Sequence, residues 1–204
     1  MNILNKYKLI VNAFFYLVLI IFLHSCNATK EDIENTSFSE KEKQTSMNLL
    51  KEFDNLLIAK IGGGSIDKAY LTYSNSLKNS KSVNDFLEKE KLYNEQYLKI
   101  IDKYKKTDFF KEVWTLKYGF NNNTKDTIIV NLDINPQGRY LDFLNIKSIN
   151  KLVLKDYIMS IKECNCIPPS IIAGFPNVIN EFDINNEEDR LIIAIHYLTI
   201  LSVM

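Results

Sequence analysis

Apolar residues recur at helical spacing over the segment 46–61. They fall three or four residues apart and form one face of a predicted amphipathic helix: Leu49, Leu50, Phe53, Leu56 and Leu57. The run Gly62–Gly64 predicts the end of this helix, because glycine adopts the left-handed conformation that follows many helices. Ser65 is expected to cap a second helix. Ser82 begins a pattern similar to a capping box, and the apolar stripe behind it predicts a third helix that extends to about Lys105.

The pattern changes from helical to alternating between residues 113 and 134. Apolar and polar residues alternate over 114–120 and again over 128–134, on either side of the polar segment 121–126. Two alternating runs around a polar turn predict a β-hairpin. The alternative is a helix from Asp108 to Tyr118, because the aromatic residues of this stretch also fit helical spacing.

The last third of the chain returns to helical spacing. We expect a short helix over 139–146, a longer one over 149–162 capped by Ser148, and mostly loop over 174–183. Residues 190–203 are apolar on nearly every face, which is typical of a central buried helix. The sequence therefore predicts one mainly α (α+β) domain over 46–204, with a small β-hairpin near 113–134.

A short basic head and an apolar run open the chain. Lys6 and Lys8 precede the run from Leu9 to Leu23, in which Asn12 is the polar exception. A bilayer's hydrocarbon core requires about 20 apolar residues, and this run is shorter. Its length is typical of the core of a signal peptide.

The end of this run resembles the lipobox of bacterial lipoproteins. Leu23 lies three residues before Cys26, and the small residue Ser25 lies directly before it. The resemblance implies that residues 1–25 are a removable signal peptide and that Cys26 carries acyl chains. Two such chains anchor a protein stably to a membrane that it does not span. The alternative is an ordinary secretory signal in which Cys26 has no role.

Residues 26–45 are expected to form a flexible tether, because their polar composition buries too little apolar surface to fold. Within it, the segment 30–32 (Lys-Glu-Asp) is similar to a signal that directs some lipoproteins to the cell surface. The alternative is that these three charged residues only keep the tether solvated and carry no signal. A periplasm-facing position and a surface-exposed position on the outer membrane therefore both stay open.

The charge balance and the cysteines limit the partners of the mature chain. Without residues 1–25, 23 basic side chains face 25 acidic ones, and this balance argues against a nucleic-acid partner. A single residue separates Cys164 from Cys166, which is too close for an ordinary zinc site. A disulfide between them, a copper(I) site and two unreactive thiols at a helix end are the open interpretations.

The acidic residues before the C-terminal helix are a candidate docking segment. Glu181, Glu187, Glu188 and Asp189 could contact a basic protein partner, although acidic groups also stabilise a helix N-terminus. His196 is expected to be a hydrogen-bonded core residue, because no nucleophile or orienting group accompanies it.

No catalytic or cofactor motif is complete in this sequence. The segment 133–138 begins like a calcium-binding EF-hand loop, but Leu144 occupies the position that requires a glutamate. We therefore expect no enzyme activity, cofactor or metal. The expected function is that of a membrane-anchored envelope lipoprotein with an unknown protein partner. The alternatives are an immunity protein that neutralises a periplasmic toxin and a lipoprotein that binds glycans or nutrients.

Overall fold

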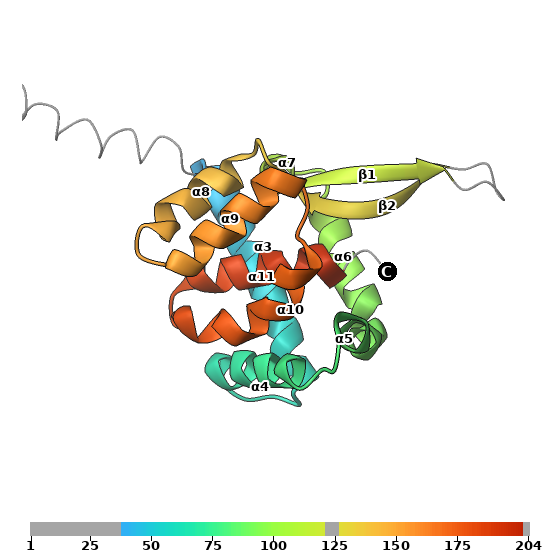
Figure 1. The fold of residues 1–204 in the computed structure, drawn as a ribbon, viewed down its shortest axis with the longest axis vertical. Helices are drawn as coiled ribbons and strands as arrows, with labels where there is room; N and C mark the ends of the chain where they lie inside the picture. Colours follow the sequence, from blue (N-terminus) through green and yellow to red (C-terminus); the bar gives the residue numbers. More distant parts are fainter. Residues whose placement is uncertain (1–37, 121–126, 202–204) are drawn as a thin grey trace, which may run out of the picture. The chain divides into compact units, whose positions relative to one another are not determined.

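The computed structural model describes residues 38–120 and 127–201. Helices predominate there, beside one two-stranded antiparallel sheet, which confirms the predicted mainly helical fold with a small hairpin (Figure 1). The elements in chain order are α3 (Glu40–Lys60), α4 (Ile66–Lys78), α5 (Val83–Glu90), η1 (Lys91–Tyr93), α6 (Asn94–Tyr104), α7 (Asp108–Val113), β1 (Trp114–Phe120), β2 (Thr127–Ile134), α8 (Arg139–Ser148), α9 (Leu152–Cys164), α10 (Pro169–Val178), η2 (Ile179–Glu181) and α11 (Glu187–Leu201).

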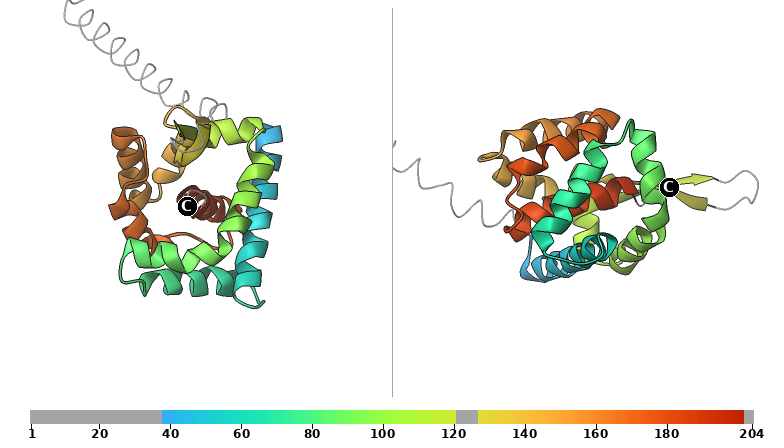
Figure 2. Two further views of the ribbon diagram at one scale, coloured as in Figure 1. Left: turned by 90° about the vertical axis from the view of Figure 1, so that its right-hand side faces the viewer. Right: turned by 90° about the horizontal axis from the view of Figure 1, so that it is seen from below.

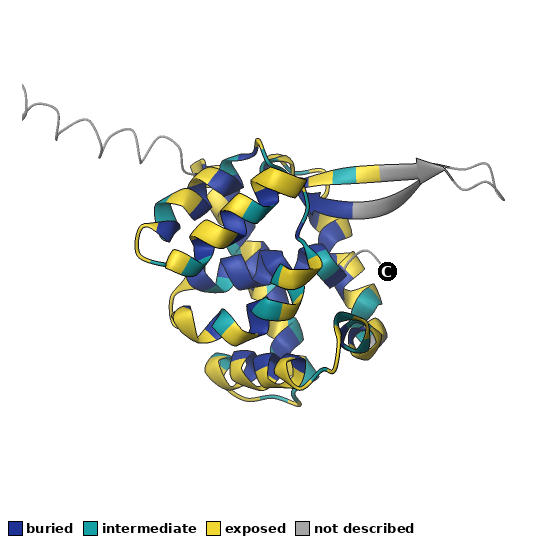
Figure 3. Cartoon of the chain, viewed as in Figure 1, coloured by how far each residue is buried: buried dark blue, intermediate teal, exposed yellow. Residues whose placement is uncertain are grey.

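Helix α11 is the centre of the domain. Every residue from Leu191 to Thr199 is buried, as its apolar composition predicts. The other helices surround α11, which the left view of Figure 2 shows nearly end-on. In Figure 3 the buried residues gather on α11 and on the sides of its neighbours that face it. The helix begins at Glu187, with the acidic residues in its first turn, and the Asn186 side chain accepts hydrogen bonds from the amides of Glu188 and Asp189.

Helix α3 begins earlier than the sequence pattern predicted. It starts at Glu40 rather than at Ser46, so the predicted tether boundary at residue 45 is wrong. Ser39 and Glu42 form a capping box, in which the Ser39 amide donates to the Glu42 carboxylate over 2.7 Å. Phe38 is buried against the rings of Phe109 and Phe143. Cap and packing together extend the folded domain to residue 38. At the other end of α3, Gly62–Gly64 have φ values of 78°, 101° and 123°, as the glycine run predicted.

The predicted third helix is divided into α5 and α6. Ser82 caps α5 as expected, but η1 interrupts the helix after Glu90. The prediction of one continuous helix to Lys105 is therefore wrong. The interruption coincides with Glu90, a carboxylate that is buried among groups from other helices. Glu90 places a carboxylate inside the apolar stripe of this segment, and this departure from the pattern marks the position of the interruption.

The hairpin and the competing helix both exist, one after the other. Thr107 caps α7, which ends at Val113, and β1 starts at Trp114. Strands β1 and β2 pair with Trp114 opposite Ile134 and Leu116 opposite Leu132, and the register shifts after Lys117. Trp114 is buried and its indole donates a hydrogen bond to Thr199 of α11 over 2.8 Å. This contact fixes the hairpin to the central helix. The predicted turn at 121–126 lies outside the described residues.

Two predictions in the last third of the chain are wrong. Ser148 belongs to the end of α8, where its hydroxyl donates to the Asn145 carbonyl, and α9 begins only at Leu152. The expected loop over 174–183 is mostly helical, because α10 runs from Pro169 to Val178. Proline is well tolerated at the first position of a helix, where its missing N–H has no partner to lose. Helices α9 and α10 are therefore neighbours joined by a short connection.

Candidate functional site

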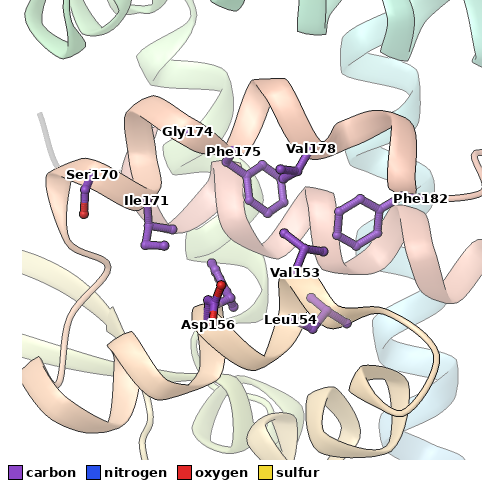
Figure 4. A pocket seen from close by; sticks show the side chains of 10 residues that line it. Val153, Leu154, Asp156, Ser170, Ile171, Gly174, Phe175, Val178 and Phe182 are labelled. Atoms are coloured by element: carbon purple, nitrogen blue, oxygen red, sulfur yellow. The ribbon is translucent and has the colours of Figure 1, made fainter.

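Helices α9 and α10 enclose an apolar groove of about 160 Å³ (Figure 4). Its walls are the side chains that the two helices turn toward each other, together with Phe182 beyond η2. Val153 and Leu154 come from α9, and Ile171, Phe175 and Val178 come from α10. Asp156 and Ser170 supply polar groups at one end. A cavity of this size and composition suits one large apolar side chain, because pockets for whole drug-sized molecules occupy roughly 300–1,000 Å³.

His196 lies beneath this groove. Its ring stacks on Phe175, with the centroids 3.7 Å apart, and its Nδ1 lies 3.3 Å from the Tyr157 hydroxyl. Burial lowers the pKa of the imidazole to about 3, since a charged ring would have no water around it. The ring is therefore neutral at physiological pH. Its ring neighbours are Tyr157, Phe175 and Tyr197. His196 is therefore placed as a hydrogen-bonded residue of the core.

Exposed apolar side chains gather on and before α9. Ile149 is 67%, Leu152 72% and Met159 54% exposed. Single exposed apolar residues are common on proteins, but three on one helix and the turn before it form a candidate contact surface. We call Ile149, Leu152, Met159 and the groove the α9 surface.

The predicted acidic segment is divided between solvent and the protein interior. Glu181, Glu187 and Glu188 are exposed, whereas Asp189 is buried. The Asp189 carboxylate accepts from the Asp183 amide over 2.7 Å and pairs with Lys151 over 2.8 Å. Glu188 pairs with Lys147. The structure thus uses Asp189 to hold α11 against the chain before α9, and it leaves the three glutamates at the surface.

Cys164 and Cys166 lie at the connection between α9 and α10. Their Cα atoms are 5.2 Å apart and the two sulfurs are paired, which is the arrangement of a disulfide, one of the three open interpretations of this pair. Asn165 between them adopts the left-handed conformation with φ 51°. Cys164 is exposed and Cys166 is partly exposed. Residues 174–183 were expected to be mostly loop, so the sequence pattern did not predict a groove between α9 and α10.

A buried polar cluster, which the sequence pattern did not predict, surrounds Glu90. Its carboxylate accepts hydrogen bonds from Tyr97 over 2.8 Å and Tyr73 over 3.2 Å, and it pairs with Lys60. Burial lowers the pKa of Lys60, and the neighbouring Glu90 partly opposes this effect. The ammonium group also lies 4.5 Å from the centroid of the Tyr73 ring and 4.2 Å from that of the Tyr93 ring. The groups come from five elements, which makes this cluster a link between α3, α4, α5, η1 and α6.

The described residues contain neither a cluster of metal-binding side chains nor a candidate membrane span. No three His, Cys, Asp or Glu side chains lie there as they would around a metal ion. Within residues 38–120 and 127–201, no helix combines the length and the apolar character that crossing a membrane requires. Cys26 and the predicted signal peptide lie outside the described residues.

A comparison with family models, curated proteins and solved structures finds no match for this chain. The site must therefore be interpreted from its own chemistry.

Proposed function

We propose that this protein is a lipid-anchored lipoprotein of the bacterial envelope that binds another protein through its α9 surface. The observations that carry the binding role are the apolar groove between α9 and α10 and, separately, the exposed side chains of Ile149, Leu152 and Met159 on α9 and the turn before it. Protein interfaces are commonly centred on an apolar side chain that fills a pocket on the partner. The anchor rests on the lipobox resemblance at Cys26.

The groove favours a protein over a small molecule as the ligand. Its lining is almost entirely apolar, and glycans require several polar groups that fix their hydroxyls. The polar groups of the buried Glu90 site are already occupied by one another. One large apolar side chain is therefore the best match to the space that α9 and α10 leave.

The anchor can be tested by labelling cells with radioactive palmitate. The parent protein should incorporate label and fractionate with membranes, and Cys26→Ala should lose both properties. Cys164→Ala is the matched control, since it removes a cysteine that lies within the folded domain and should keep the label. Label on the Cys26→Ala variant, or firm membrane association without Cys26, would contradict the lipid anchor.

The binding role can be tested with a photo-crosslinking amino acid placed at Leu152 or Met159. Both positions are exposed on α9, so the probe should not disturb the core. We expect one discrete crosslinked protein from each position in the native envelope. Leu71 on α4 is the control, because it is 49% exposed and distant in sequence from the α9 surface. Equal crosslinking from Leu71, or none from α9, would argue against this surface.

A further inference from the structure

The Cys164–Cys166 pair has the features of a reactive disulfide rather than a structural one. A disulfide stabilises a fold mainly by limiting the unfolded chain, and this effect decreases as the closed loop shortens. Here the loop contains only Asn165 between the two cysteines. Both sulfur-bearing residues have access to solvent, and exposed disulfides are the ones that exchange with external thiols. The disulfide therefore adds little to the stability of the fold. Its exposure makes it suited to exchange with external thiols.

The two sulfurs occupy different electrostatic positions. Cys164 is the last residue of α9, where the helix dipole is negative. Cys166 lies two residues before Pro168, the N-cap of α10, where the dipole is positive. A thiolate is better stabilised on the α10 side. Attack on the more exposed Cys164 sulfur would thus release the better leaving group, the Cys166 thiolate.

The groove and the cysteine pair are linked through α10. Ser170 and Ile171, in the first turn of α10, line the groove (Figure 4), and they follow Cys166 by four and five residues in the chain. A polypeptide whose apolar side chain entered the groove would contact α10, the helix that follows Cys166 in the chain. Apolar segments with free cysteines are typical of proteins that have not yet completed folding.

We propose that Cys164 and Cys166 form a thiol–disulfide exchange site whose substrates are cysteine thiols flanked by apolar residues in another polypeptide. A substrate thiolate attacks the Cys164 sulfur, the Cys164–Cys166 bond breaks, and Cys166 leaves as a thiolate that takes a proton from water. A second substrate thiolate then attacks the substrate sulfur of the mixed disulfide and releases Cys164. The substrate loses two electrons and two protons and gains a disulfide. The cysteine pair gains them and becomes a dithiol, which a disulfide oxidant such as oxidised glutathione returns to the starting state.

This inference goes beyond protein binding and does not depend on the anchor. All proteins for its test carry Cys26→Ala, so that Cys164 and Cys166 are the reacting cysteines. The oxidised protein is mixed with a peptide that has one cysteine between leucine and phenylalanine residues. The released thiol is then alkylated, and peptide mapping locates both modifications. We expect the peptide on Cys164 and the alkyl group on Cys166. No mixed disulfide would overturn the proposal, and a peptide attached mainly to Cys166 would overturn the assigned direction of attack.

The role of the groove has a separate measurement. A second peptide replaces the apolar residues with serine and should react about tenfold more slowly, in line with the loss of one buried apolar side chain. Ile171→Ser should remove most of this preference. Ile172→Ser is the matched control, because Ile172 is also partly buried but lines a different cleft with Pro176 and Asn177. Reduced glutathione, which needs no groove, should react equally with all variants. Equal rates for the two peptides on the parent protein would overturn the role of the groove.

Discussion

Glu90 and His196 are both buried polar side chains, but they have very different surroundings. Glu90 is 3% exposed and is held by Lys60, Tyr73 and Tyr97. His196 is fully buried, has one hydrogen bond to Tyr157, and its Nε2 has no hydrogen-bond partner among the described residues. The comparison shows that burial alone does not decide what a polar group does for a fold. The number of its partners decides how many helices it links: Glu90 contacts groups from three other helices, whereas the one hydrogen bond of His196 joins α11 to α9.

The largest expected effect is that of Lys60→Met. The substitution leaves the Glu90 carboxylate buried without its ion-pair partner, so we expect the free energy of unfolding to fall by about 3–5 kcal/mol. Chemical denaturation at pH 7 measures this loss. The double variant Lys60→Met with Glu90→Leu should recover much of the stability, because removal of both charges leaves no uncompensated one. If the double variant is as unstable as the single one, the cluster is not held together by this ion pair.

Tyr97→Phe should have the next largest effect. It removes a 2.8 Å hydrogen bond to the Glu90 carboxylate, and hydrogen bonds to charged groups contribute about 1.5–3 kcal/mol. Tyr197→Phe is the matched control, since the Tyr197 hydroxyl is buried without a hydrogen-bond partner in the described structure. We expect its unfolding free energy to change by less than about 0.5 kcal/mol. Similar losses from both variants, measured by denaturation, would remove the distinction between the two sites.

The smallest expected effect is the contribution of His196 to the pH dependence of the free energy of unfolding. Its pKa is lowered from 6.5 to about 3 on folding, so below pH 6.5 the unfolded chain binds a proton that the folded protein excludes. Stability should therefore fall as the pH falls from about 6.5 toward 3. The contribution of His196 between pH 7 and 5.5 is about 1 kcal/mol.

His196→Leu isolates this contribution from that of the carboxylates. The variant should lose less stability than the parent when the pH falls from 7 to 5.5, in paired denaturation measurements at both values. An identical pH dependence of parent and variant would show that the imidazole is accessible to protons in the folded protein.

The parts of the fold that follow from local sequence were predictable. Ser65 and Ser82 cap the helices that they were expected to cap, and the alternation around residue 121 predicted the hairpin. The start of α3 was missed because its first turn is polar in sequence. Its stability comes from contacts with distant residues, such as Phe109 and Phe143 against Phe38.

The candidate site was less predictable than the fold. The segment 174–183 was expected to be mostly loop, yet its first residues lie within α10, and the groove depends on that helix. Glu90 gave a visible signal, a charge within an apolar stripe, but its partners come from α3, α4 and α6. A single sequence shows which residue is unusual. It does not show which distant residues surround it.

The position of α11 at the centre of the domain has a consequence for how the protein is made. The helices that surround it come earlier in the chain, so their apolar sides lack the surface of α11 until residues 187–201 have been synthesised. Long-range contacts of this kind delay folding. The domain should therefore complete its core only after α11 has left the ribosome.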